Sequence, residues 1–456
     1  MAHAPAVLPA AAVLPAAAGL IFSLALGLAC APRATLDPAA TEESYAHLRE
    51  ALDAYREDGF MVGPPEFPVV GRAMTLPGPA DSMWVGYAAS LPASALRFAR
   101  EGELFAARYQ VTLLILDGTD TLRRIERRET VRVDDFPETV ARDPTIVFQR
   151  FVVAPSRPLE LGVTVRELSS RREAEGLLRV TPPSGLAEPL LAYQAATRQA
   201  FDQSPPVIVS PRNTLFASEG LASLLLEGGT ADTGRVVVSA SVDGQVVWSD
   251  SVTMTAAQGA PASVLLALPV RRLPPGPASL GVNRPGEGTI RTLALYAGLS
   301  PEWVPSSWPV AIDQLRYALD ADTLKAWREL RPMERSGAWE RFQDRSDPDP
   351  ATAANEYLKG YFERMSLAND RYDEPGRAGW ESDRGQVLVR LGEPDRQRFI
   401  RPERQGEVPR LEWEYEESES GGALIVFEDA TDFGVWMLTP RSRAVVRRVE
   451  RERAAG

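Results

Sequence analysis

The chain has 456 residues and a formal charge of −12, from 50 basic and 62 acidic side chains. This length corresponds to about three domains, and a hydrophobic content of 44% is ordinary for a globular protein with a buried core. The one cysteine and two histidines exclude an internal disulfide and a zinc site built from Cys and His. They also leave His47 as the one histidine outside the extreme N-terminus, so Ser-His-Asp or Cys-His catalysis would have to use it. The acidic balance disfavours a nucleic-acid partner.

The N-terminal segment is apolar, and no charged side chain precedes Arg33. Residues 1–29 therefore read as a secretory signal peptide. The single cysteine, Cys30, follows Gly27-Leu28-Ala29 in a pattern that resembles a bacterial lipobox, although the family prefers leucine at 27 and a small residue at 28. The resemblance implies that Cys30 is acylated and begins a lipid-anchored tether over 30–41. It also implies an extracytoplasmic protein, with the outer membrane favoured because alanine follows the cysteine.

A plain transmembrane anchor is the alternative for this segment, because ~20 apolar residues span a bilayer. Pro9 and Pro15 interrupt the stretch, however, and an anchor leaves Cys30 unexplained.

The next segment, residues 42–60, is predicted to contain an amphipathic helix. Thr41 is a suitable N-cap, and two glutamates follow it where the helix dipole favours acids. Apolar side chains then recur at helical spacing: Tyr45, Leu48, Leu52 and Tyr55. His47 lies off this stripe, so a solvated histidine is the simpler interpretation.

Within residues 68–183 apolar side chains recur at every second position instead of at helical spacing. This pattern predicts strands, and we expect a first β-sandwich here. Strands are expected near 83–89, 104–116, 122–133, 146–153 and 159–165. Asp117-Gly118 is a turn signal between two of them. Residues 184–204 are predicted to be a linker with a short helix.

Residues 205–299 predict a second β-sandwich, with a hairpin at Asp243-Gly244. The two predicted sandwiches share a weak sequence repeat. Residues 151–155 lead through a proline turn to the alternating residues 159–163, and residues 266–269 lead through another to 278–282. We therefore expect two tandem immunoglobulin-like modules.

Residues 309–440 predict a mixed α+β domain, with helices over 309–370 and a β part over 379–440. The clearest helix is 350–369, in which Ala354, Leu358, Tyr361, Met365 and Ala368 repeat at helical spacing behind an Asp349-Pro350 start. Strands are expected at 387–391, 411–415, 424–427 and 435–438. Residues 441–456 form an Arg-rich tail, expected to be solvated and frayed.

The start of this β part carries a motif. Residues 379–385 read Gly-Trp-Glu-Ser-Asp-Arg-Gly, and Gly-Glu-Pro-Asp follows at 392–395. This resembles the GWxTD domain, a bacterial family, with Ser382 in place of the motif threonine. An upstream Asp347-Pro348 before a helix ending at Asn369, and the alternating strand at 411–415, extend the resemblance. It implies a secreted or lipidated protein with β modules in front, and it implies no established enzymatic activity.

The motif residues have a structural interpretation. Gly379 turns the chain, Trp380 buries a large apolar area between helix and sheet, and Ser382 and Asp383 bond backbone amides. Gly385 is expected to adopt a positive φ before a strand. Residues 392–395 are expected to form a turn.

The functional alternative makes this region a polar ligand site, formed by Gly379, Trp380, Ser382, Asp383, Arg384, Gly385, Glu393, Pro394 and Asp395. Paired carboxylates at Asp383 and Asp395 would then be able to perform acid/base chemistry on an envelope polymer.

No metal or other cofactor is expected. Asp344, Asp347 and Asp349 are oxygen-rich, but they lack EF-hand spacing, and helix capping explains Asp349. The sequence favours a multidomain, β-rich, non-enzymatic lipoprotein that binds a protein or polymer of the cell envelope. A carboxylate-dependent hydrolase is the alternative.

Overall fold

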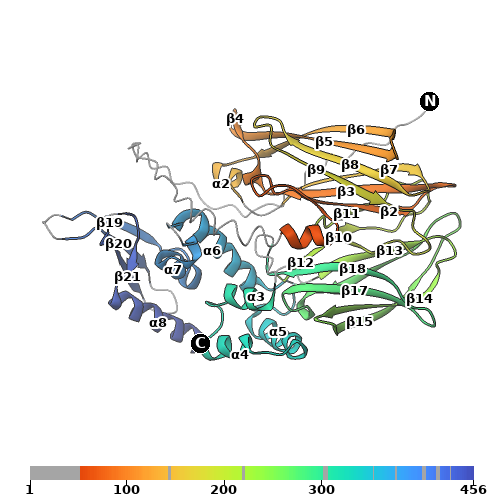
Figure 1. Ribbon diagram of the computed structural model, residues 1–456. Coiled ribbons are helices and arrows are strands. Elements are labelled where there is room, and N and C mark those ends of the chain that lie inside the picture. The colour runs from red at the N-terminus through yellow and green to blue at the C-terminus, as the bar shows by residue number, and fades with distance from the viewer. Residues whose placement is uncertain are drawn as a thin grey trace. The chain divides into compact units, whose positions relative to one another are not determined.

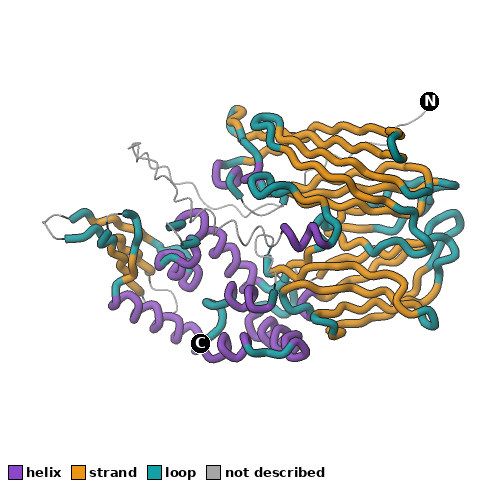
Figure 2. The backbone as a smooth tube through the Cα atoms, viewed as in Figure 1, coloured by secondary structure: helices purple, strands orange, loops and turns teal. Residues whose placement is uncertain are grey.

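The computed structural model describes residues 52–455 except 142–144, 218–220, 301–306, 353, 375–376, 403–406, 417–421 and 432. The expected signal peptide, Cys30, the expected tether and residues 42–51 of the expected helix lie outside the described residues. The described elements between residues 61 and 298 are mostly strands, and helices dominate from 308 onward (Figures 1 and 2). No helix in the described part is long and apolar enough to cross a membrane.

The first sandwich consists of two sheets. One has the order β1-β2-β3-β7, from Met61–Val62, Val70–Pro77, Ser82–Leu91 and Ile146–Pro155. In the other, β5 (Leu104–Asp117) pairs with β6 (Asp120–Val133), β4 (Ala99–Glu101) and β8 (Leu159–Glu167), and β8 pairs with β9 (Glu173–Val180). A one-turn helix, α2 (Phe136–Thr139), and the short 3-10 helix η1 (Ala93–Ala95) lie between strands.

Alternation in the sequence explains the core of this sandwich. Tyr109, Val111, Leu113 and Ile115 of β5 are all buried. The last three stand opposite Val165, Val163 and Leu161 of β8. The buried residues of β5 and of β8 therefore alternate in step and form one apolar face. The predicted turn at Asp117-Gly118 is confirmed by a positive φ at Gly118.

The second sandwich repeats this topology. Its first sheet has the order β11-β10-β13-β16, and its second has the order β12-β18-β17-β14-β15. The bounds are β10 Leu190–Ala195, β11 Val207–Val209, β12 Thr214–Phe216, β13 Leu221–Gly228, β14 Gly234–Val242, β15 Gln245–Met254, β16 Ala262–Pro269, β17 Gly276–Arg284 and β18 Gly288–Gly298, with η2 at Val270–Arg272. Asp243 and Gly244 both have positive φ, which confirms the predicted hairpin turn.

Strand order makes the repeat explicit. The trio β2-β3-β7 corresponds to β10-β13-β16, and the quartet β6-β5-β8-β9 corresponds to β15-β14-β17-β18. The two similar sequence segments are β7–β8 and β16–β17, which hold equivalent places. Both modules are immunoglobulin-like sandwiches, with three equivalent strands facing four.

The predicted helix in 184–204 is wrong, because this segment contains strand β10. Leu190, Leu191 and Ala192 are buried in succession. Leu191 packs in the core of the second sandwich, while Leu190 and Ala192 pack against the first. A strand buried on both faces loses the period-two pattern by which strands are recognised.

The two sandwiches meet sheet on sheet through apolar side chains. Those from the first sandwich are Met74, Leu76, Trp84, Ala88 and Phe151, and those from the second are Ala187, Leu190, Ala192, Val207, Val209 and Leu225. A large apolar junction of this kind favours a fixed arrangement of the two modules.

Polar groups at this junction are satisfied internally. Arg198 and Glu227 form an ion pair whose side chains are fully buried. Arg198 also donates to the carbonyl of Pro77, at 2.6 Å, and Trp84 donates to the carbonyl of Phe201, at 2.8 Å. Each of these two carbonyl bonds connects one sandwich to the other.

Residues 52–57 are helical and cover one end of the junction. Leu52, Tyr55 and Phe60 form a small core with Val70 of the first sandwich and Tyr296 of the second. The described end of the predicted amphipathic helix therefore contacts both modules.

The C-terminal domain begins with four helices: α3 (Trp308–Gln314), α4 (Ala321–Arg328), α5 (Pro332–Ser346) and α6 (Glu356–Tyr372). The expected apolar face of α6 is confirmed, because Leu358, Tyr361, Met365 and Ala368 are all buried. The expected start of this helix at Asp349-Pro350 is wrong. Asn355 caps it instead, accepting a bond from the amide of Leu358 at 3.1 Å, while Asp349 bonds the amide of Ala351 in a turn.

The β part of this domain is a four-stranded sheet in the order β19-β20-β21-β22: Arg396–Ile400, Arg410–Tyr415, Ala423–Glu428 and Met437–Leu438. The predicted strand at 387–391 is wrong, because Asp383–Leu391 is helix α7. Val387, Leu388, Val389 and Leu391 are all buried, so a short helix surrounded by neighbours resembled a buried strand in sequence.

The expected frayed tail is also corrected. Pro440–Ala455 is helix α8, and Val446 and Val449 are buried in the core of the domain. The spacing of three between these valines is helical, but the surrounding arginines obscured it in the sequence.

Ion pairs accompany the contact between the second sandwich and the C-terminal domain. Arg271 pairs with Asp347 at 2.9 Å and with Asp344 at 3.1 Å, and Arg272 pairs with Glu340 at 3.6 Å. Asp344 and Asp347 therefore neutralise one arginine, and Asp349, the third residue of this acidic group, lies in the turn before α6.

The buried pair between the sandwiches generates a prediction. Replacing Glu227 by glutamine leaves the Arg198 charge buried without a counter-charge, so we expect a loss of about 3–5 kcal/mol in the free energy of unfolding. Urea unfolding measures it. Glu175→Gln removes an exposed carboxylate from β9 and is expected to change stability by under about 0.5 kcal/mol. Equal stability of the two variants would contradict the role assigned to the pair.

Candidate functional site

The motif at 379–385 forms the connection between α6 and α7. Gly379–Glu381 is the 3-10 helix η3, Ser382 is the N-cap, and α7 starts at Asp383. Glycine is required at both 379 and 385, because a side chain at either position would collide with a neighbouring backbone. A Cβ on Gly379 would lie 2.1 Å from the carbonyl oxygen of Ala368, and one on Gly385 would lie 1.9 Å from that of Gly379. The expected positive φ at Gly385 is wrong, because this residue lies in the first turns of a helix and its requirement is steric.

Trp380 fixes this connection to the helical part of the domain. Its amide donates to Oδ1 of Asn369 at 3.1 Å. Its ring meets the edge of Tyr317 at a centroid distance of 5.7 Å, and the Arg316 guanidinium lies 4.6 Å from its centroid. Trp380 is buried, as expected, in a core that also contains side chains of the sheet, and its aromatic contact with Tyr317 comes from the segment after α3.

Ser382 performs the capping role expected of the motif hydroxyl. Its Oγ accepts from the amide of Gly385 at 3.0 Å and donates to the carbonyl of Gly379 at 2.7 Å. The side chain is fully buried. Both hydrogen-bonding functions of the hydroxyl are thus used within the motif.

Asp383 connects α7 to the end of the chain. Its Oδ2 accepts from the amide of Leu438 in β22 at 2.6 Å. Arg443 of α8 lies 3.4 Å from the same oxygen, and Arg377 lies 4.0 Å from Oδ1. The carboxylate is therefore held by one amide and two cations.

Arg384 lies at the centre of a largely buried polar and aromatic cluster, which comprises the buried Glu374 and Tyr372 and the partly buried Arg384 and Trp436. The guanidinium is 3.4 Å from Oε1 of Glu374, and it lies 4.9 Å and 6.0 Å from the rings of Tyr372 and Trp436. Glu374 also accepts from the amide of Trp436 at 3.3 Å. This arrangement joins the end of α6 to α7 and to the segment before β22.

Burial dominates the electrostatics of this cluster. It raises the pKa of Glu374 and lowers the pKa of Arg384, and in each case the partner charge opposes the shift. Burial also raises the pKa of Tyr372. Sequence reasoning missed Glu374, and the sequence carried no signal for it because its partners come from segments 10 and 62 residues away.

The second half of the expected site is a turn, as predicted. Glu393 pairs with Arg371 of α6. Pro394 follows it. Oδ2 of Asp395 accepts from the amide of Glu416 at 2.6 Å, and the Asp395 amide donates to the carbonyl of Glu414 at 2.9 Å. This turn therefore holds the end of β20.

The two aspartates are held at different ends of the sheet. Asp383 binds Leu438, which stands opposite Phe427, and Asp395 binds Glu416, just beyond the pair Tyr415–Ala423. Ala423 and Phe427 are four residues apart on β21, or ~13 Å along the strand. Paired carboxylates in glycoside hydrolysis are about 5–9.5 Å apart. The geometry therefore does not form the carboxylate pair that the hydrolase alternative requires.

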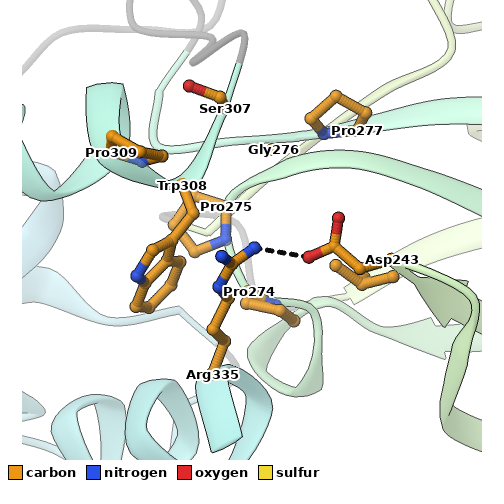
Figure 3. A pocket seen from close by; sticks show the side chains of 10 residues that line it. Asp243, Pro274, Pro275, Gly276, Pro277, Ser307, Trp308, Pro309 and Arg335 are labelled. Carbon is orange, nitrogen blue, oxygen red and sulfur yellow. Dashed lines mark hydrogen bonds and ion pairs between the residues drawn. The ribbon is translucent and has the colours of Figure 1, made fainter. Parts of the chain in front are cut away.

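A cavity of about 280 Å³ lies between the second sandwich and α5 (Figure 3). Pro274, Pro275 and Pro277 line it, together with Trp308 and Arg335. Arg335 extends beside the Trp308 ring, 5.7 Å from its centroid, and pairs with Asp243 at the hairpin turn. The one charged pair in this lining is thus satisfied within the protein.

Among the described residues, no group of three or more His, Cys, Asp or Glu side chains could hold a metal ion. The arrangement at 379–395 can cap a helix, close a turn and join three segments.

The glycine packing generates a prediction. Gly385→Ala forces a methyl group into the backbone of Gly379, so we expect a loss of about 3 kcal/mol in the free energy of unfolding. Gly337→Ala, within α5, meets only the tip of Arg341 at 3.3 Å and is expected to stabilise the protein by about 0.5–1 kcal/mol. Thermal or urea unfolding distinguishes them. A Gly385→Ala protein as stable as the parent would show that the close approach is not required.

Comparison with solved structures finds partial similarity only. The chain is similar to red sea bream transglutaminase (8% identity, TM-score 0.16, covering 50% of this chain and 31% of that one). It is similar to E. coli alpha-2-macroglobulin (12%, 0.17, 53% and 16%) and to the BSP domain of a biofilm associated protein (7%, 0.17, 56% and 54%). The chain spans about a third of the transglutaminase, a sixth of the macroglobulin and half of the BSP domain.

No curated protein matches the chain. A family model does match residues 312–433, and its description is the GWxTD domain. The matched residues run from α3 to the segment before β22 and include the whole motif. The chain is a GWxTD domain-containing protein.

Proposed function

We propose that this protein is a non-enzymatic lipoprotein of the cell envelope, which binds or scaffolds a protein or polymer partner through its β modules and GWxTD domain. One observation carries the proposal: the polar motif side chains are engaged by the fold itself. Ser382, Asp383 and Asp395 each accept a hydrogen bond from a backbone amide. A carboxylate held in this way is a poor candidate for proton transfer to a substrate.

The two sandwiches support a presenting role. Their apolar junction, with the buried Arg198–Glu227 pair inside it, favours a single unit over two independently moving modules. Partner binding to such a unit costs little ordering of the chain.

Membrane attachment is assigned to Cys30. The apolar residues before it, its lipobox-like context and the absence of charge before Arg33 support acylation there. Two or more acyl chains give stable anchoring where one does not.

The anchor is testable by mass. We expect the mature protein from its native host to begin at Cys30, with an intact mass that includes acyl groups. Cys30→Ala is expected to abolish the acyl mass and to release the protein from the membrane fraction, whereas Ala31→Ser, which keeps the thiol, retains both. A mature Cys30 without acyl groups would refute the lipoprotein assignment.

The motif carboxylate is testable by substitution. Asp383→Asn weakens its contacts with the Leu438 amide and Arg443, so we expect a loss of about 1–2 kcal/mol of stability. Below the unfolding temperature we expect cross-linked pull-down from membranes to recover the same partners as the parent. Asp202→Asn, at an exposed turn, is the control for charge removal.

The hydrolase alternative predicts the opposite result. Asp383→Asn would then keep the parent stability and lose the cellular phenotype. That outcome would reject a structural role for the carboxylate and favour chemistry or ligand binding at the motif.

A further inference from the structure

A second cavity, of about 360 Å³, opens where both sandwiches and the residues following the first helical segment meet. Its polar lining comes from Asp58, Arg72, Arg179, Glu188 and Asn213, and Phe60 contributes an aromatic side chain. The volume is at the lower end of the range of small-molecule sites, about 300–1,000 Å³. The cavity thus fits a small polar ligand.

Arg72 is the unusual residue of this cavity. Arg72, Met74 and Leu76 occupy alternate positions of β2, so their side chains lie on the same face of the strand. This is the face that meets the second sandwich. The Arg72 side chain is only 5% exposed. Nη1 donates to Oδ1 of Asn213, whose own Nδ2 donates to the carbonyl of Ala294 at 3.1 Å. The second sandwich thereby fixes the orientation of the guanidinium.

The other terminal nitrogen of Arg72 is unsatisfied. Among the described residues, Nη2 has no hydrogen-bond partner and is shielded from solvent. Oε1 of Glu188 lies 3.5 Å away, close enough for an ion pair but not arranged as a hydrogen bond. A buried donor without a partner costs stability, and in a folded protein such a group calls for an explanation, for example a bound water, ion or ligand.

The charges around Arg72 limit what this ligand can be. Two cations, Arg72 and Arg179, and two carboxylates, Asp58 and Glu188, line the cavity, so the formal charges cancel. Asp58 is fixed on one side by a bond from the Tyr296 hydroxyl at 2.7 Å. Two wall carboxylates would repel a phosphate or a dicarboxylate. They would instead attract an ammonium group on a ligand whose carboxylate meets the arginines.

We propose that this cavity binds a small zwitterion, namely a free amino acid or a short peptide. The carboxylate of the ligand accepts from Nη2 of Arg72, with Arg179 nearby, and its ammonium group lies between Glu188 and Asp58. Both ligand charges are then compensated, and the unsatisfied nitrogen gains its partner. Because Arg72 and Arg179 belong to the first sandwich and Glu188 and Asn213 to the second, the bound ligand bridges the junction and stabilises it.

Calorimetry on the detergent-solubilised full chain tests the proposal. Each of the twenty free L-amino acids, and glycylglycine, is titrated singly, followed by the N-acetyl and the methyl ester form of any that bind. We expect at least one zwitterion to bind, and we expect blocking of either its amine or its carboxylate to weaken binding by about tenfold or more.

Variants locate the site. Glu188 is half exposed, so Glu188→Gln is expected to fold normally and to weaken binding by about tenfold, and Arg72→Lys, which keeps the charge but not the guanidinium, is expected to do the same. Glu175→Gln, also an exposed carboxylate, is expected to bind as the parent does.

Three results would overturn the proposal. One is no binding of any zwitterion at millimolar concentration. The second is acetate binding as tightly as the best amino acid, which would indicate a simple anion site. The third is unchanged binding in a folded Glu188→Gln protein, which would place the ligand elsewhere. None of these results bears on the lipid anchor or on the motif.

Discussion

The burial of one sheet from each sandwich against the other is the constraint on which the rest of the structure depends. Strands β2, β3 and β7 cannot expose the face that carries Met74, Trp84 and Phe151, and strand β10 has no exposed face along Leu190–Ala192. Sheets that are apolar on both faces must be covered on both. The duplication of the module supplies the cover, because the equivalent sheet of the second copy presents a matching surface.

This arrangement also decides where polar groups can lie. Arg72, Arg198 and Glu227 are all buried near the junction, and each is oriented by a group across it or by its ion-pair partner. Such groups add specificity because only one relative position of the modules satisfies them. The C-terminal domain uses a different means, with two glycines that allow backbone contact around η3 and with an arginine held between aromatic rings.

Much of this architecture is predictable from sequence, for physical reasons. Strands β5 and β8 have one buried and one solvated face, so their period of two is visible, and Asp243-Gly244 meets the positive-φ requirement of a tight hairpin. Prediction fails where burial is complete. β10 and α7 each contain a short run of consecutive buried apolar residues, Leu190–Ala192 and Val387–Val389, and such a run does not show the period that distinguishes a strand from a helix. The start of α6 was misplaced because Asp349 and Asn355 are both good caps, and only the packing of Asn355 against Gln343 selects between them.

The candidate site was predictable in part. The capping hydroxyl of Ser382 and the amide contact of Asp383 follow from residue type and position alone. The partners of Arg384, and the separation of Asp383 from Asp395, depend on pairings between strands that are distant in sequence. Arg72 was missed altogether, because a single arginine in a strand reads as a solvated side chain until the second module covers it.

The two contacts of the second sandwich differ in their sensitivity to the surrounding medium. Its contact with the first sandwich is mainly apolar, and the ion pair inside it, Arg198–Glu227, is fully buried and therefore little screened by dissolved ions. Its contact with the C-terminal domain includes the exposed pair Arg272–Glu340, which mobile ions screen, and the pair Arg271–Asp347, whose carboxylate is fully buried and is screened far less. A rise in ionic strength would therefore weaken the rim of the contact with the C-terminal domain more than the junction between the sandwiches, where the partly exposed pair Arg72–Glu188 has a buried guanidinium. The salt content of the surroundings thus acts more strongly on one boundary of the molecule than on the other.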